Sequence, residues 1–234
     1  MSKTAMREEW VEARKTLLSK EKALTRANDE LAALRRQLPH VKTEKAYQFE
    51  GPNGPASLSD LFEGRKQLII YHFMFSPDDT DGCVGCSFFA DNFPAYLQHL
   101  NSRDTTLVMV SRAPYSAIEP FKKRMGWTVP WYSSFGSDFN YDFHATNDEA
   151  IAPMMANWES AESLRARGKG NYITGEQSAL SVFLAGPEGA IYHTYSAFSR
   201  GLDVFLGTNH LLDVTPLGRQ DGEFWAYHDK YEEN

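Results

Sequence analysis

The sequence predicts an α/β protein in which helices flank a central sheet and a long N-terminal helix is added. Two almost continuous apolar runs, residues 67–75 and 105–114, have the composition of strands that are buried on both faces. A helix predicted over residues 86–100 separates them, so the three elements form a βαβ unit with a right-handed crossover. Two later strand-like runs, residues 179–185 and 190–198, predict a hairpin across the turn GPEG.

Composition and charge exclude several classes of protein. The chain has 234 residues, of which 42% are hydrophobic and 13% aromatic, enough for a full core in one or two domains. The formal net charge is −7 and the positive residues are dispersed, so we expect no nucleic-acid and no anionic-membrane partner. The first residues lack the apolar stretch of a secretion signal, and no run approaches the roughly 18 apolar residues of a membrane span. A cytoplasmic location is therefore expected.

A long helix is predicted from Arg7 to Leu38, where Pro39 ends it. Its apolar side chains recur every seven residues in one row, and a second row is offset by three: Trp10, Leu17, Leu24, Leu31 and Leu38, then Ala13, Ala27 and Leu34. Lys20 interrupts the second row, so a long and regular coiled coil is not expected. We divide the chain into an N-terminal helical arm, residues 1–39, and one domain, residues 40–234. The arm is expected to pack on its own domain, and packing across a homodimer is the alternative.

Two further helices and an aromatic segment complete the pattern. Residues 116–127 follow the second strand, and Ser116 with Glu119 would form a capping box at the start of that helix. Residues 201–214 predict the last clear helix. The segment 125–143 is rich in aromatic side chains, which either anchor an irregular stretch of chain or line a pocket for an apolar ligand.

The only two cysteines, Cys83 and Cys86, lie two residues apart at the junction between the first strand and the following helix. In a reducing compartment a Cys-x-x-Cys pair more often serves redox chemistry or metal binding than a structural disulfide. A helix N-terminus lowers the pKa of a nearby thiol, and the thiolate is the nucleophile. Three carboxylates in the same loop act in the opposite direction: Asp78, Asp79 and Asp81. We predict Cys83 as the exposed attacking thiol and Cys86 as the more buried resolving thiol.

The order strand, Cys-x-x-Cys, helix, strand, helix, hairpin, helix resembles the thioredoxin fold in its peroxiredoxin-like form. Longer segments, among them YHFMFSPDDTDGCVGCSF and HTYSAFSRGLD, are similar to those of a thioredoxin-like bacterial family of unknown function. The resemblance covers nearly the whole chain and implies a peroxiredoxin-type central sheet. Two departures bear on activity. Gly82 stands where thioredoxins carry a tryptophan, and SPDDTDGC is one residue shorter than the peroxiredoxin signature Pro-x-x-x-Thr-x-x-Cys.

The preferred hypothesis of function is a thiol–disulfide oxidoreductase or thiol peroxidase. Such an enzyme needs no organic cofactor, only an external thiol reductant and a small-molecule or disulfide substrate. Arg112 follows the second strand, where strand ends meet ligands in open α/β sheets. We predict that Arg112 stabilises the thiolate or binds an anionic substrate group, and Arg200 is a weaker candidate for the same role.

Two alternatives stay open. One is a copper- or zinc-binding protein of the same fold, in which Cys83, Cys86 and His193 are the ligands. His72 is a second histidine on a predicted strand near the proposed site. The other alternative is a non-catalytic module that binds a small ligand through the aromatic segment 125–143.

Overall fold

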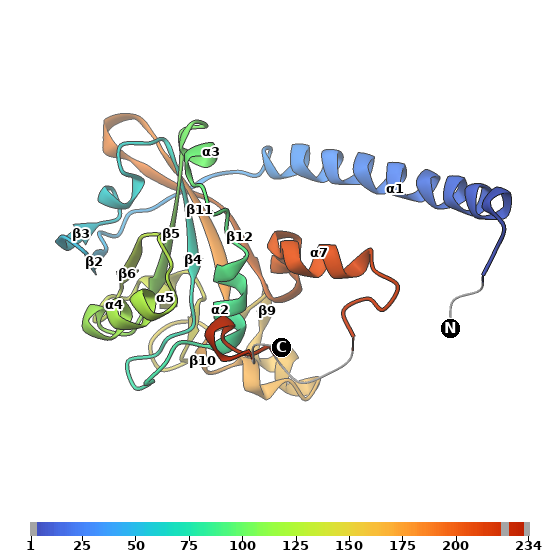
Figure 1. Cartoon of the computed structure of the whole chain (residues 1–234). Helices are drawn as coiled ribbons and strands as arrows, with labels where there is room; N and C mark the ends of the chain where they lie inside the picture. The colour runs from blue at the N-terminus through green and yellow to red at the C-terminus, as the bar shows by residue number, and fades with distance from the viewer. Residues whose placement is uncertain (1–3, 221–224, 232–234) are drawn as a thin grey trace.

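The computed structural model describes residues 4–220 and 225–231. A mixed sheet of eight strands forms its centre, in the order β1-β12-β11-β4-β5-β6-β2-β3 (Figure 1). The strands of this sheet are β1 (Val41–Lys42), β2 (Gln48–Gly51), β3 (Gly54–Ser57), β4 (Gln67–His72), β5 (Thr105–Ser111), β6 (Trp131–Ser133), β11 (Ala179–Ala185) and β12 (Ile191–Phe198). Two short antiparallel pairs lie outside it: β7 (Thr146–Asn147) with β10 (Gly175–Glu176), and β8 (Met155–Ala156) with β9 (Glu159–Ser160).

The helices vary widely in length. The α-helices are α1 (Arg7–Arg35), α2 (Val84–Asp91), α3 (Gln98–Asn101), α4 (Tyr115–Arg124), α5 (Phe139–Asp142), α6 (Ala161–Ala166) and α7 (Gly207–Asp213). Short 3-10 segments are η1 (Asp60–Phe62), η2 (Gly170–Tyr172), η3 (Pro187–Gly189), η4 (Ser199–Phe205) and η5 (His228–Lys230). Within the ranges 4–220 and 225–231, no helix combines the length and the apolar character needed to cross a membrane.

Four strands of the sheet define the fold. β4 and β5 run parallel and are joined through α2, and α4 follows β5. β11 pairs antiparallel with β4, and β12 pairs antiparallel with β11. The spatial order β5-β4-β11-β12 with these directions is that of a thioredoxin-like α/β fold. The predicted α/β class, its central sheet, the βαβ unit and the hairpin are therefore confirmed.

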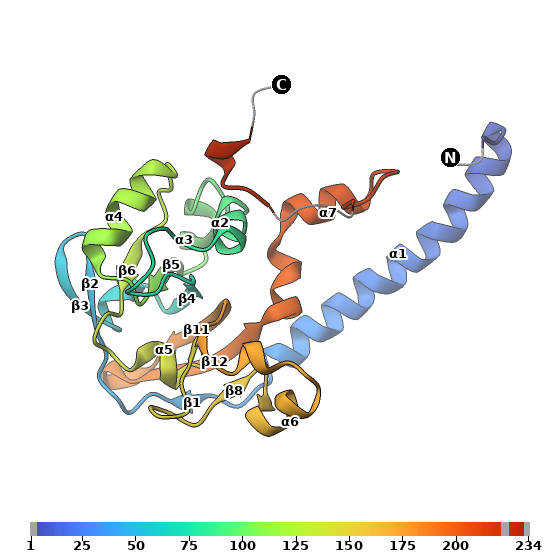
Figure 2. The same ribbon diagram turned by 90° about the horizontal axis from the view of Figure 1, so that it is seen from below.

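Each face of the sheet carries its own apolar core. Successive side chains of a strand point to opposite faces, so a strand covered on both sides is apolar throughout. Tyr71 of β4 packs in the core that α2 and α4 cover, together with Phe89 and Phe121. Ile70 of the same strand packs in the opposite core, beside Phe139 of α5. Figure 2 shows α2 and α4 on one side of the sheet and α5 on the other.

The N-terminal arm is helical as predicted, but it does not pack along its own domain. Within α1, which is described throughout, no residue is buried. Figure 1 shows the helix extending away from the sheet, and contact is confined to its C-terminal end, where the Arg35 guanidinium lies 5.4 Å from the centre of the Tyr195 ring. The expectation that the arm packs on its own domain is therefore wrong for most of its length.

Three predicted helices differ from the observed ones in their bounds. The helix expected over residues 86–100 is interrupted, because α2 ends at Asp91 and a proline follows at position 94. α4 begins one residue earlier than expected, after an N-cap at Pro114, so Ser116 is not its cap. The segment 201–214 is divided at Leu206 into the end of η4 and α7.

Candidate functional site: a dithiol at the start of α2

Cys83 is the N-cap of α2, and the loop after β4 holds it there. The backbone of Cys83 is extended (φ −57°, ψ 132°), and its carbonyl accepts the first helical hydrogen bond from Ser87 N–H at 2.9 Å. Its own N–H donates to the carbonyl of Met74 at 3.0 Å. At Gly82 a Cβ atom would lie 2.6 Å from the ring of Phe73, so only glycine fits this approach to the core. The position of the Cys83 thiol is thus fixed by the backbone on both sides.

Hydrogen bonds to Cys83 lower the pKa of its thiol to about 6. The largest cause is the thiol of Cys86, which donates to Cys83 Sγ, and the backbone N–H groups of Gly85 and Cys86 add to it. Partial burial of Cys83 and the carboxylate of Asp79 act in the opposite direction but are outweighed. Cys83 is therefore mostly thiolate at pH 7, and its side chain remains partly exposed.

Cys86 has the opposite character. It is 2% exposed, and burial raises the pKa of its thiol, as does its hydrogen bond to Cys83. The N–H of Met74 donates to Cys86 Sγ at 3.4 Å, and the hydroxyl of Tyr71 also forms a hydrogen bond with it. One thiol is thus partly exposed and ionised, and the other is buried and keeps its proton.

The carboxylates of the loop before Cys83 oppose its thiolate less than the sequence suggests. Asp81 accepts a hydrogen bond from Arg124 at 2.9 Å, and Arg124 also bonds to Asp229. Asp79 accepts from the N–H of Ser76 at 2.8 Å. The expected opposition from these carboxylates to a low thiol pKa is present for Asp79, but the hydrogen bonds to the thiolate dominate.

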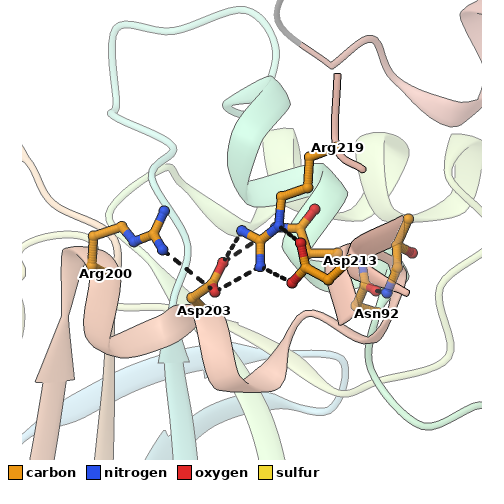
Figure 3. A network of polar contacts seen from close by, with 7 residues as sticks. Asn92, Arg200, Asp203, Asp213 and Arg219 are labelled. Carbon is orange, nitrogen blue, oxygen red and sulfur yellow. Dashed lines mark hydrogen bonds and ion pairs between the residues drawn. The ribbon is translucent and has the colours of Figure 1, made fainter. Parts of the chain in front are cut away.

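A small cavity of about 200 Å³ lies against the first turn of α2, although neither thiol lines it. Gly85, between the two cysteines, lines it together with Tyr71, Phe89 and Arg200. Its outer wall is formed by η4, which is fastened by a network of charged groups (Figure 3). In this network Arg219 bonds to both Asp203 and Asp213, and Asn92 at the end of α2 accepts from the first turn of α7.

Arg112 pairs with a buried carboxylate and has no hydrogen bond to either thiol in the described chain. Its guanidinium donates to Glu176 Oε1 at 2.8 Å and lies 4.8 Å from the centre of the Tyr141 ring. Glu176 is almost fully buried and also accepts from Thr146 Oγ1 at 2.6 Å. Arg112 therefore connects β5 to β10, and Arg200 is the predicted arginine that borders the cavity beside α2.

The proposed metal ligands are not brought together. Cys86 packs in the core under α2, whereas the ring of His193 contacts Phe143 and Phe183 of the opposite core. In the part of the chain that the structure describes, no group of three His, Cys, Asp or Glu residues is placed to hold a metal ion. The predicted set of Cys83, Cys86 and His193 is therefore corrected, since the sheet separates the histidine from the thiols.

The histidines instead belong to a polar chain on the other face of the sheet. His193 Nε2 lies 2.8 Å from Ser196 Oγ, which is 3.0 Å from Ser181 Oγ, which is 3.0 Å from His72 Nε2. Burial lowers the pKa of His72 to about 3 and also lowers that of His193, so both rings are neutral at pH 7. This arrangement is a hydrogen-bonded core rather than a set of ligands.

A second and larger cavity, of about 720 Å³, adjoins that chain. His193 and Tyr195 of β12 line it, with Phe143, Trp158 and the residues that join α1 to β1. Trp158 and His144, both in its wall, have positive φ values of 65° and 56°. Such backbone is rare for large side chains and is often found at ligand sites. The other rings of the segment 125–143 are mostly core, since Trp131 and Phe139 are fully buried.

Sequence reasoning missed two tyrosines at the dithiol. Tyr71 lies in the apolar run of β4, and a hydroxyl group in a buried strand needs a partner, which was the available signal. Tyr227 donates to the carbonyl of Gly82 at 2.6 Å across 145 residues of sequence, and no local pattern indicates that contact.

These features define a thioredoxin-like α/β protein with a polarised dithiol at the start of its first core helix. The model of one family, described as "Bacterial protein of unknown function (DUF899)", matches residues 1–231, nearly the whole chain. The chain belongs to this family. A comparison with curated proteins finds no match.

Solved structures with a similar arrangement include several peroxiredoxins. A cysteine-to-serine variant of PrxQ from Xylella fastidiosa is 16% identical, with a TM-score of 0.41 over 72% of this chain and 89% of that one. Peroxidoxin BcpB from Mycobacterium tuberculosis is 13% identical, with a TM-score of 0.43 over 72% and 96%. The mitochondrial 2-Cys peroxiredoxin from Plasmodium falciparum is 12% identical, with a TM-score of 0.43 over 74% and 94%. These similarities are too distant to transfer an activity to this chain.

Proposed function

We propose that this protein is a thiol-based oxidoreductase, a thiol–disulfide oxidoreductase or thiol peroxidase, in which Cys83 attacks the substrate and Cys86 resolves the intermediate. The observation that carries the proposal is the asymmetry of the pair. Cys83 is partly exposed with a pKa of about 6, and Cys86 is buried with a raised pKa and donates its proton toward Cys83. An accessible thiolate next to a protonated partner is the arrangement that thiol exchange requires.

The electron balance is the same for both substrate classes. With a disulfide, the Cys83 thiolate attacks one sulfur, forms a mixed disulfide and releases the other sulfur as a thiolate. With a hydroperoxide, Cys83 takes the terminal oxygen as a sulfenic acid and releases an alcohol. Cys86 then loses its proton and attacks Cys83 Sγ, which closes the Cys83–Cys86 disulfide and expels a thiolate or water. An external thiol returns two electrons, and no organic cofactor takes part.

The small cavity near the two cysteines has room for only a small group of a substrate. The cavity next to Gly85 has a volume of about 200 Å³ and includes the guanidinium-bearing Arg200 in its wall. That side chain is mostly exposed and pairs with Asp203 at 3.7 Å, so it is available to an anionic group on a substrate. A reducing compartment supplies the thiol reductant, and we therefore assign the reaction to the cytoplasm.

Two serine variants test the assignment of roles. Cys83→Ser should abolish reduction of both a hydroperoxide and a small disulfide, because no thiolate remains to attack. Cys86→Ser should keep the first step and accumulate a mixed disulfide that mass spectrometry detects after reaction with a disulfide substrate. Ser102→Ala, an exposed change after α3, is the control and should turn over at the native rate. Turnover by Cys83→Ser at a rate near that of the native chain would refute the proposal.

A second candidate function, binding of a small uncharged ligand, is favoured by the larger cavity. Its volume of about 720 Å³ lies within the usual range for ligand pockets, and aromatic side chains form much of its wall. His193 Nε2 donates to the carbonyl of Tyr195 at 3.0 Å, so the neutral ring leaves Nδ1 as an acceptor. An aromatic ligand with a hydroxyl group matches this combination.

Fluorescence titration with 2-naphthol tests this second function. We expect saturable binding, and Trp158→Ala should weaken it about 10-fold because an aromatic wall is lost. Phe135→Ala removes an aromatic ring that is 61% exposed and lies outside the cavity, so it should leave the affinity unchanged. Equal losses in both variants, or no saturable binding by the native chain, would exclude this cavity as the site.

A further inference from the structure

The apolar rows of α1 form a seam that the rest of the described chain leaves uncovered. Its larger side chains are widely exposed: Trp10 51%, Leu17 53%, Leu24 63%, Leu31 44% and Leu34 59%. The helix has 29 residues and is therefore about 44 Å long at 1.5 Å per residue. Helices in proteins gain most of their stability by packing an apolar face, and an exposed apolar stripe of this length is typical of an interface.

The seam faces away from the domain. At the end of α1 that meets the domain, the partly covered residues are Ala32, Ala33 and Arg35. Their heptad positions lie beside or behind the seam, whereas Leu31 and Leu34 in the seam stay exposed. Figures 1 and 2 both show the helix projecting freely beyond this contact. A second helix can therefore reach the seam along its whole length.

We propose that α1 pairs with α1 of a second copy of this chain in a parallel, in-register, two-stranded coiled coil whose regularity Lys20 interrupts. Rows that repeat every seven residues with an offset of three are the positions that such a coil buries. The charges beside the seam select the orientation. In a parallel coil, Glu9 lies opposite Arg14 of the second copy and Glu30 lies opposite its Arg35, because flanking positions pair with those five residues later.

An antiparallel pair would bring like charges together beside the seam, whereas the parallel pair does so only at Lys20 within it. The antiparallel pair places Arg7 near Arg35 of the second copy and the two Glu21 side chains near each other. Within the described chain, Arg14 Nη1 has no hydrogen-bond partner although it is buried, while the other end of the same guanidinium bonds to Glu21. The parallel pairing would place Glu9 of the second copy beside this guanidinium.

Lys20 favours an assembly of two chains over one of three. In the parallel coil two Lys20 side chains meet in one layer, from which their ammonium groups can extend into water along the helix surface. A trimer would gather three positive charges in the same layer, so the dimer is preferred. The proposal is independent of the thiol chemistry, since no residue of α1 belongs to the dithiol or its cavity.

Sedimentation equilibrium of the full chain tests the assembly. The native protein should have about twice the 26.5 kDa mass of one chain. Leu17→Glu/Leu24→Glu should raise the dimer dissociation constant by about 100-fold or more, because a buried leucine is lost from each chain at each position. Ser19→Glu/Thr25→Glu adds the same charges to the outer side of the helix and should remain dimeric. A native monomer, or equal effects in both variants, would overturn the proposal.

Disulfide cross-linking tests the orientation. In a chain with Cys83→Ser and Cys86→Ser, Ala27→Cys should form a covalent dimer under mild oxidation, since the parallel register places the two positions side by side. Lys22→Cys, on the outer side of α1, should not cross-link at the same concentration. An antiparallel coil would instead separate the two residues at position 27 and join Ala27→Cys to Leu17→Cys in a mixed sample. That result would overturn the parallel register.

Discussion

At the level of single residues, the two thiols differ in pKa because their surroundings differ, although they lie within one helical turn of each other. Cys83 ends an extended loop and receives hydrogen bonds at a helix start, whereas Cys86 lies one turn later in the core beside Tyr71. The same two side chains in a uniform environment would share their protons equally. The site is thus produced by the place where the strand ends and the helix begins.

A pair of substitutions at Cys86 tests the cause of the low pKa of Cys83. Cys86→Ala removes the thiol that donates the strongest hydrogen bond, so the midpoint for alkylation of Cys83 by iodoacetamide should rise from about 6 toward the ordinary thiol range. Cys86→Ser retains a hydroxyl donor and should shift the midpoint less. If both variants titrate like the native chain, the hydrogen bond from Cys86 is not the cause.

Much of this residue-level picture could be read from the sequence, and part of it could not. The spacing of Cys83 and Cys86 and their position after an apolar run predict a dithiol at a helix start. The partners that complete the site come from distant segments: Tyr227 bonds across 145 residues to Gly82, and Arg200 comes from the segment after the hairpin. Arg112 was assigned to the site because strand ends converge there, but a buried glutamate binds it instead.

At the level of secondary-structure elements, long periodic segments were predictable and short ones were not. The strands β4 and β5 are almost continuous apolar runs, β11 and β12 flank a recognisable turn, and α1 has a clear heptad pattern. The short strands β1, β2, β3 and β6 have two to four residues, too few for any periodicity, and were missed. The arm was expected to lie on its own domain because an apolar row indicates a partner without indicating which one.

The connection between β5 and β10 through Arg112 leads to a prediction about stability. Arg112→Gln should lower the free energy of unfolding at pH 7 by about 2 kcal/mol, because it removes a charged hydrogen bond from a buried carboxylate. Burial already raises the pKa of Glu176, and loss of Arg112 raises it further above the unfolded value. As the pH falls, protonation of Glu176 in the variant removes the unpaired buried charge. Urea unfolding should therefore show a smaller loss in the free energy of unfolding at pH 5 than at pH 7.

A matched change separates this buried pair from surface pairs. Arg165→Gln breaks an exposed ion pair with Glu149 and should change stability little at either pH. Folded Arg112→Gln protein should also keep native turnover of thiol substrates if the role of Arg112 is structural. A loss of turnover without a loss of stability would return Arg112 to the active site.

At the level of the whole molecule, the sheet separates two regions of different chemistry. The dithiol and its small cavity lie on the face covered by α2 and α4, whereas the larger cavity and the neutral histidines lie on the other. Tyr71 and His72 are consecutive residues of β4, and their side chains lie on opposite faces because side chains alternate along a strand. The sequence alone predicts His193 near the cysteines, whereas the sheet places it on the opposite face, against Phe143 and Phe183.

Contacts from the end of the chain predict a long-range effect on the site. Tyr227→Phe removes the hydroxyl that donates to the Gly82 carbonyl at 2.6 Å, and we expect a loss of about 1 kcal/mol in the free energy of unfolding. The rate of Cys83 alkylation should rise as well, because the loop before it is less restrained. Tyr96→Phe, at a ring that is 70% exposed, should alter neither quantity. Identical behaviour of the two variants would show that the contact does not restrain the loop.

The segment 225–231 therefore has a consequence for biosynthesis. Trp225 stacks on Phe88 of α2, Tyr227 holds the loop before Cys83, and Asp229 pairs with Arg124 of α4. These residues follow every strand of the sheet along the chain, so a ribosome makes them after the strands have been synthesised. Until residues 225–231 are made, the nascent chain carries two thiols whose neighbours are incomplete, so the dithiol acquires its final surroundings only after the sheet has been synthesised.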